Sequence, residues 1–314
     1  MPRTRGHIEP NHVIAFLQLF LHVLVPVFAL VALGYFIGPR LEFQARTLSR
    51  LAYFVLSPVF VFVLLSGAKV EAAVTGRMIA YITAVYLGSM LIAFVAARLT
   101  RRSREMTAAW VMVAVFGNVG NFGLPISQFA QGKEALVPAT IYFIANCVLA
   151  FVVCVTAAKL TMGGNPLQAL IGVAKTPSLI AVVPALIINA LGITLPVPIA
   201  RPMELLTGAL IPIMLLVLGV QLAQAGIPRP TGNMLAPIAI RLIGGAALSL
   251  LLAAPFGLSG LERNVGILQG SMPSAVLVSL IALENQMMPE FLTTTVLLSN
   301  VLSIVSLAVV LTLM

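Results

Sequence analysis

The residues Asn118-Val119-Gly120-Asn121-Phe122-Gly123-Leu124-Pro125 interrupt an apolar segment that is otherwise long enough to form a membrane helix. Two glycines and a proline within six residues disfavour a regular helix. Glycine is conformationally permissive, whereas proline lacks an N–H and clashes with the carbonyl four residues earlier. At membrane depth, freed backbone groups are tolerated only where they are buried in protein or line a polar cavity. The stretch therefore predicts an interrupted helix with a binding site near the bilayer midplane.

The composition is that of a polytopic α-helical membrane protein. Hydrophobic residues make up 60% of the 314-residue chain and charged residues 9%, with a mean hydropathy of +1.09. Apolar stretches long enough to span about 30 Å of hydrocarbon recur along the whole length. We expect ten spans, at roughly 13–37, 46–66, 76–98, 106–130, 134–160, 167–192, 200–223, 234–255, 262–284 and 290–313.

The same composition excludes several classes of function. The short connections leave no room for a soluble catalytic domain, and the absence of a Gly-x-x-x-x-Gly-Lys-[Ser/Thr] string argues against direct use of ATP. The three histidines, His7, His12 and His22, leave no zinc motif or Ser–His pair deeper in the chain. We therefore expect no enzyme, cofactor or metal site. The net charge of +9 indicates basic cytoplasmic loops in contact with a lipid bilayer rather than a nucleic-acid surface.

The two halves of the chain share landmarks that predict an internal repeat. Val25–Gly34 and Val183–Gly192 have Val, Pro, Ala, Leu and Gly in common at an offset of 158 residues (184 − 26). Further pairs are Pro58 and Pro212 (offset 154), Pro125 and Pro273 (148), and Asn146 and Asn300 (154). Five spans per repeat reverse the orientation of the second copy. We therefore expect a first five-helix repeat at 1–161 and a second, inverted one at 162–314.

The distribution of Lys and Arg predicts the orientation. Ten lie in the odd-numbered connections, and seven lie in the N-terminus and the even-numbered connections. Because basic loops stay in the cytoplasm, both termini are expected on the non-cytoplasmic side of the cell (inner) membrane.

A second interruption, Gln269-Gly270-Ser271-Met272-Pro273-Ser274, lies in the ninth expected span. In an inverted repeat the two interruptions meet near the centre, with their prolines as the candidate crossing point. Each outgoing half-helix would then direct N–H groups and the positive end of its dipole toward the midplane, where they attract anions. The candidate substrate-binding residues are Asn118, Gly120, Asn121, Gly123, Pro125, Asn146, Ser57, Gln269, Ser271, Pro273, Ser274 and Asn300.

Simpler roles compete for some polar residues. Asn146 and Asn300 could hold neighbouring helices together through interhelical hydrogen bonds. Arg241, about 10 Å inside the eighth span, is expected to snorkel to the interface, with attraction of an anion as the alternative. Neither interruption contains an acidic residue, which a pocket for a cationic substrate would ordinarily need. The chemistry favours an organic anion held by amides, hydroxyls and helix ends.

Three strings, Gly117–Pro125, Ser271–Ala275 and Leu298–Ser303, resemble the auxin efflux carrier family of prokaryotic and plant transporters, and the resemblance covers essentially the whole chain. It implies the fold of bile acid sodium symporters, with a scaffold of spans 1, 2, 6 and 7 and a core of spans 3–5 and 8–10. Elevator-like movement of the core would give alternating access. It also implies homodimers and organic-anion substrates, auxin-like in plants and malate- or malonate-like in bacteria. The absence of a long central hydrophilic loop argues against auxin itself.

The leading hypothesis is a secondary transporter of small organic anions, driven by the substrate gradient and membrane potential or by protons. The alternative carrier is a sodium-coupled organic anion symporter of the bile acid type. Its sodium site needs several oxygens, and Gln128, Gln269, Asn118 and Ser271 could supply some, with no carboxylate at hand. An anion channel or a membrane receptor is the alternative from another class.

Overall fold

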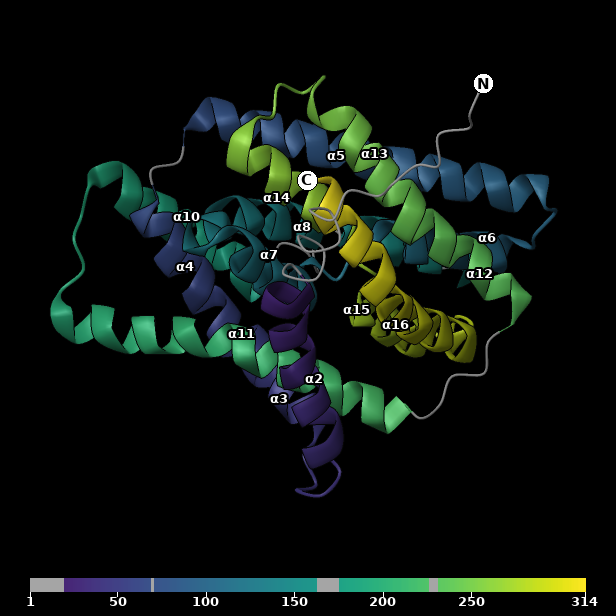
Figure 1. Cartoon of the computed structure of the whole chain (residues 1–314), viewed down its shortest axis with the longest axis horizontal. Coiled ribbons are helices and arrows are strands. Elements are labelled where there is room, and N and C mark those ends of the chain that lie inside the picture. The colour runs from purple at the N-terminus through teal and green to yellow at the C-terminus, as the bar shows by residue number, and fades with distance from the viewer. Residues whose placement is uncertain (1–19, 69–70, 163–174, 226–230) are drawn as a thin grey trace, which may run out of the picture.

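The computed structural model of the protein describes residues 20–68, 71–162, 175–225 and 231–314, and the regular elements in these ranges are helices (Figure 1). Six helical segments there are long and apolar enough to cross a membrane: Ala45–Gly67, Ala72–Leu99, Lys133–Cys154, Val197–Gln224, Gly232–Ala253 and Pro289–Leu313. Leu21–Ile37 and Pro177–Leu191 are shorter apolar helices. The expected class, an all-α multi-pass membrane protein, is confirmed.

The helix bounds follow the expected spans closely wherever the chain is described. In the first half they are the π turn η1 (Phe20–Leu24), α2 (Val25–Ile37), α3 (Ala45–Leu51), the π turn η2 (Ala52–Leu56), α4 (Ser57–Gly67), α5 (Ala72–Leu99), α6 (Arg104–Val115), the π turn η3 (Val119–Gly123), α7 (Leu124–Gln131), the 3-10 turn η4 (Lys133–Ala135) and α8 (Leu136–Met162). In the second half they are α10 (Pro177–Leu191), α11 (Val197–Ala225), α12 (Gly232–Ala239), the π turn η5 (Ile240–Gly244), α13 (Gly245–Ala253), α14 (Gly260–Gly270), α15 (Val276–Glu284) and α16 (Pro289–Leu313). Residues 13–19 and 167–174 of the first and sixth expected spans lie outside the described residues.

Three prolines mark where a π turn passes into an α-helix. Pro26, Pro58 and Pro125 each lie at the second residue of a helix that directly follows a π turn. Proline has no N–H to donate, so it fits where the hydrogen-bond ladder is already disturbed. The chain therefore tolerates these prolines inside apolar segments without losing the helix on either side.

The helices form two packed groups. In the first, α2 packs along α11 and α4 along α10, as the lower left of Figure 1 shows. Gly34 and Gly219 allow α2 and α11 to approach closely, because a Cβ atom at either would collide with backbone of the other helix. In the second group, α5, α6 and α8 pack together and α12–α16 complete it. The main contacts between the groups come from η3, α7 and α8.

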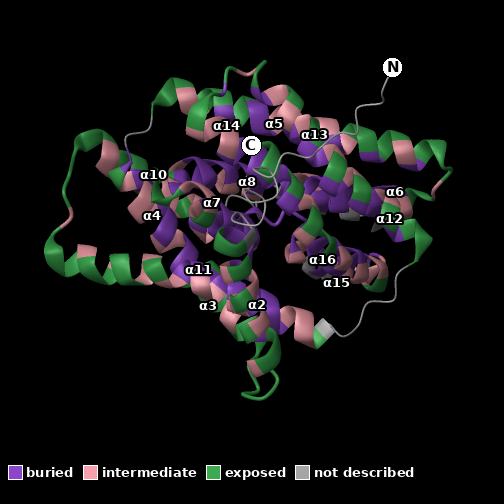
Figure 2. Ribbon diagram, in the orientation of Figure 1, coloured by how far each residue is buried: buried purple, intermediate pink, exposed green. Residues whose placement is uncertain are grey.

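Burial is concentrated where the interrupted helices lie. In Figure 2 buried residues gather around α6, α7 and α8, whereas the outer helices carry exposed apolar residues. Leu251 is 70% exposed and Val305 is 69% exposed, as expected for side chains that face lipid. The centre of the molecule is therefore the part of the described chain that holds its polar residues away from lipid.

Candidate functional site

The two interruptions lie side by side and antiparallel. The Asn118 N–H donates to the Pro273 carbonyl at 2.7 Å, and the Ala275 N–H donates to the Phe116 carbonyl at 2.7 Å. Gly117 and Ser274 face each other in an isolated antiparallel bridge between these bonds. We call this region, residues 116–118 and 273–275, the crossing. Each interrupted helix thus satisfies part of its freed backbone through the other.

The expectation that the two interrupted segments cross at their prolines is wrong. Pro273 lies in the crossing and accepts a hydrogen bond there, but Pro125 lies beyond η3, in the first turn of α7. A pair of backbone hydrogen bonds between the two segments needs one N–H donor from each segment, and proline has no N–H to donate. The donors are Asn118 and Ala275, and the crossing is centred on Gly117 and Ser274.

Both outgoing half-helices begin with open backbone donors. In η3 the first turn is closed by the N–H groups of Phe122 and Gly123, which donate to the Asn118 carbonyl at 3.2 and 3.0 Å. Among the described residues, the N–H groups of residues 119–121 have no hydrogen-bond acceptor, nor do those of residues 276–277 at the start of α15. Unpaired N–H groups at a helix N-terminus carry partial positive charge and bind anions.

Three predicted residues form one network at the crossing. The Asn118 side-chain amide donates to Asn300 Oδ1 at 3.1 Å, and Asn300 Nδ2 donates to the Ser274 carbonyl at 3.0 Å and the Val296 carbonyl at 2.9 Å. The Ser274 N–H donates to Ser299 Oγ at 3.1 Å. α16 thereby holds the crossing in place. Asn300 makes hydrogen bonds between segments, which is the simpler role that the sequence left open for it.

Asn121 differs from Asn118. It is half-buried, and in the described part of the chain its side chain makes no hydrogen bond to another residue. It sits in η3 beside Gly120, where a Cβ atom would lie 2.9 Å from the Phe143 ring, so glycine is needed for this packing. Asn121 is therefore the amide of the first interruption that is available to a ligand.

Gln269 of α14 packs against the first interruption. A Cβ atom at Gly123 would collide with its carboxamide, so the glycine makes room for this side chain. Gln269 Nε2 donates to Ser127 Oγ at 3.2 Å, and the buried Oε1 has no partner among the described residues. Because a serine hydroxyl can donate or accept, turning the amide over keeps the Ser127 bond and makes the free atom a donor. The buried Ser274 Oγ likewise has no partner there.

Three of the predicted site residues already use their side chains in hydrogen bonds to other groups of the protein. Ser57 Oγ shares a hydrogen bond of 2.8 Å with Ser178 Oγ, which joins α4 to α10. Asn146 accepts from the Tyr86 hydroxyl at 2.6 Å, which joins α8 to α5. The Ser271 hydroxyl donates to the Ile267 carbonyl at 2.7 Å, within its own helix end. These three side chains are used in local or interhelical bonds.

Arg241 was expected to snorkel, and this expectation is wrong. Its side chain is fully buried. Nε donates to the Met272 carbonyl at 2.7 Å, Nη1 to the Ala114 and Val115 carbonyls at 3.0 and 3.3 Å, and Nη2 to the Gly270 carbonyl at 3.4 Å. These carbonyls lie where α6 and α14 end and have lost their helical partners, so the guanidinium satisfies them. No sequence motif marks this pairing.

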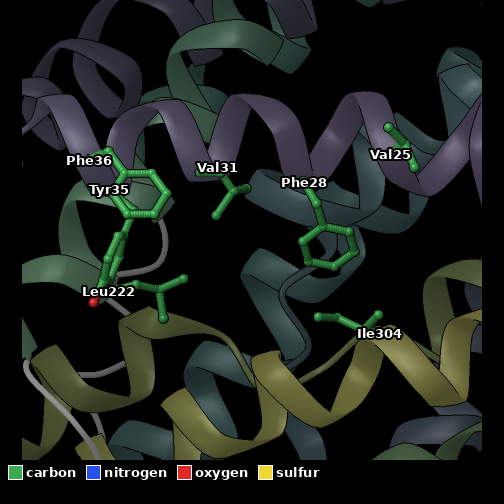
Figure 3. Close-up of a pocket in the computed structure, with 8 residues that line it drawn as sticks. Val25, Phe28, Val31, Tyr35, Phe36, Leu222 and Ile304 are labelled. Carbon is green, nitrogen blue, oxygen red and sulfur yellow. The ribbon is translucent and has the colours of Figure 1, made fainter.

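An apolar cavity of about 360 Å³ lies next to the first interruption (Figure 3). It is lined by Val25, Phe28, Val31, Ala32, Tyr35, Phe36, Leu222 and Ile304, from α2, α11 and α16. None of the predicted site residues lines it. The Phe28 ring packs edge-on against that of Phe122 in η3, with centroids 5.5 Å apart, so one lining residue of the cavity contacts the interruption.

Apolar helices arranged around paired interruptions are typical of membrane transport proteins. A family model described as "Membrane transport protein" matches residues 166–311. The chain is also 28% identical over 290 residues to an uncharacterized transporter of Methanothermobacter thermautotrophicus, covering 90% of this chain and 94% of that one. An uncharacterized transporter of Methanocaldococcus jannaschii is 24% identical over 266 residues, or 81% and 86% of the two chains.

These similarities agree with the resemblance seen in the sequence. The chain is similar to membrane transport proteins, through the family model in its second half and through two relatives over most of its length.

Proposed function

We propose that the protein is a secondary transporter of small organic anions, malate- or malonate-like or auxin-like carboxylates, which bind beside the crossing and undergo no enzymatic step. The observation that carries this proposal is the pair of outgoing half-helices that begin with open N–H groups in the buried centre. Such groups attract a carboxylate, and the sequence places no acidic residue in either interruption to compete with it.

The candidate site residues have two different proposed roles: some donate to the substrate, and others hold the crossing in position. Asn121, the N–H groups of residues 119–121 and 276–277, and the free atoms of Gln269 and Ser274 are the donors proposed for the substrate. Asn118 and Asn300 position the crossing through their mutual bond. The adjoining apolar cavity would take the hydrocarbon part of a substrate, because its lining offers almost entirely carbon.

The proposed mechanism is alternating access by an elevator-type movement. The fold behind it is ten spans in two inverted repeats, 1–161 and 162–314, with α2–α4, α10 and α11 as the scaffold and the remaining helices as the core. Two observations support it: the helices pack as two groups, and the first interruption lies at the contact between them. The same proposal places both termini on the non-cytoplasmic side of the cell membrane and includes a homodimer.

Uptake of radiolabelled malonate and L-malate into proteoliposomes tests this function. A carrier gives uptake that saturates with concentration and is accelerated by unlabelled carboxylate on the opposite side. Flux that rises linearly without such acceleration would indicate a channel. Absence of any carboxylate uptake or binding across a broad panel would refute organic anion transport.

A further inference from the structure

Four backbone carbonyls converge at the ends of the incoming half-helices. Two belong to the last residues of α6, Ala114 and Val115, and two to Gly270 and Met272, at and just beyond the end of α14. Carbonyls at a helix C-terminus carry the negative end of the helix dipole. In transporters with discontinuous helices, such carbonyls are the ligands of a coupling cation. The four carbonyls beside the crossing are therefore the kind of oxygen set that binds a cation.

In this protein the positive group at these four carbonyls is a side chain, the guanidinium of Arg241. The Arg241 guanidinium donates to all four oxygens from inside the core. Arginine keeps its charge in proteins, and its planar group offers five donors in a fixed geometry. In the described part of the chain, no ion pair links Arg241 to a glutamate, and the sequence contains no aspartate. The carbonyl dipoles are thus its main compensation.

The surroundings are shaped for this group. Gly117, in the crossing itself, lies so close to Nη2 that a Cβ atom there would collide with the guanidinium. Arg241 is carried on the π turn η5, between α12 and α13. A π turn widens the helix locally and is frequent at functional sites.

We propose that Arg241 is a tethered cation that permanently occupies the carbonyl site beside the crossing in place of a sodium ion. The incoming half-helices end on this positive charge, and the outgoing half-helices begin with N–H groups, so an anion at the crossing meets positive charge from both. Binding of the anion then needs no sodium at this position. This consequence for coupling rests on the proposed anion transport, whereas occupancy of the site by Arg241 does not.

Chemical rescue tests the tethered cation directly. Replacing the side chain in Arg241→Ala should vacate the carbonyl site. Guanidinium at about 10 mM should then raise the melting temperature of the purified variant by about 3 °C, and the same concentration of sodium chloride should do less. Wild type and Arg104→Ala, which alters an exposed arginine, should not respond. No shift in Arg241→Ala, or an equal shift in Arg104→Ala, would overturn the proposal.

If Arg241→Ala does not fold, Arg241→Lys and Arg241→Met decide the same question. Both keep a long side chain, but only lysine keeps the charge. We expect Arg241→Lys to retain a higher melting temperature than Arg241→Met. Equal stability would mean that the side chain fills space and does not act as a cation.

Transport measures the consequence for coupling. Malonate or L-malate uptake by wild type should be unchanged when choline replaces sodium. Arg241→Ala should lose uptake about tenfold or more and recover part of it in guanidinium. Sodium-dependent uptake by wild type would overturn the inference about coupling. If no carboxylate is transported at all, the proposed function fails, and the melting experiment still decides whether Arg241 occupies a cation site.

Discussion

The two interruptions start from similar sequences and end in different surroundings. The first continues into a π turn whose Asn121 is half-buried without a side-chain hydrogen bond in the described chain, and it packs against α11 and Phe28 of the first helix group. The second has Pro273 in the crossing and a fully buried Ser274, and its outgoing helix α15 packs on α8 and α16. The first interruption therefore presents its free groups at the contact between the helix groups, whereas the second presents its free groups from within one group and anchors the crossing there.

The comparison also bears on the predicted repeat. Pairing the prolines gives an offset of 148 residues, yet the residues that face each other in the crossing, Gly117 and Ser274, are 157 apart (274 − 117). That value agrees with the offsets of 154 and 158 found between the other landmarks. The residues that face each other in the crossing thus lie at nearly the offset predicted for the repeat, whereas the two prolines lie at a shorter one.

Labelling with an impermeant thiol reagent should give the largest difference between the two interruptions. Ser103 and Ser259 are exposed residues that immediately precede the incoming half-helices α6 and α14. In an inverted repeat they lie on opposite sides of the membrane. In a background without Cys147 and Cys154, Ser259→Cys should be labelled in intact cells and Ser103→Cys should be protected. Labelling of both residues from one side would refute the inverted orientation, and a reversed pattern would refute only the sidedness.

Asn121→Asp should cause the largest loss of transport among single substitutions at the site. It places a negative charge where the substrate carboxylate is proposed to bind, and repulsion of several kcal/mol corresponds to a loss of affinity of roughly 100-fold or more. The control is Asn264→Asp, which changes another half-buried amide, in α14 outside the crossing. Wild-type uptake of malonate by Asn121→Asp would remove Asn121 from the substrate site.

The loss of carboxylate uptake on replacing a proline with alanine should decrease with the distance of that proline from the crossing. Pro273→Ala supplies an N–H that can pair with the Gln269 carbonyl and extend α14 across the break, so we expect carboxylate uptake to fall roughly tenfold. Pro125→Ala changes the first turn of α7 and should have a smaller effect, and Pro26→Ala in α2 a smaller one still. Uptake is compared at equal expression. Equal uptake by all three alanine variants would mean that neither interruption depends on its proline.

Gly117→Ala should act on stability. The added methyl group collides with the Arg241 guanidinium, and overpacking of this kind costs about 2 kcal/mol. Gly76→Ala in α5 is the matched control, because a Cβ atom there meets open space and alanine favours the helix. Thermal unfolding of the purified variants measures both. Unchanged stability of Gly117→Ala would show that the guanidinium can move aside at little cost.

Much of the fold could be predicted because it depends on local properties. Apolar length identifies the spans, and glycine beside proline identifies the interruptions. The partners across the crossing could not be predicted in the same way. Asn118 and Asn300 are 182 residues apart, and Arg241 reaches Ala114 over 127. Such pairs depend on how helices pack, so Asn146 and Asn300 look equivalent in the sequence, although one contacts α5 and the other contacts the crossing.

Equilibrium binding by the purified wild-type protein tests the central claim most directly. Malonate, L-malate and indole-3-acetate are titrated calorimetrically at constant ionic strength, each beside its neutral amide. An anion site made of helix N-termini and amides predicts saturable binding of at least one carboxylate, no binding of its amide, and loss of that binding in Asn121→Asp. Equal binding of a carboxylate and its amide, or unchanged carboxylate binding in Asn121→Asp, would contradict it.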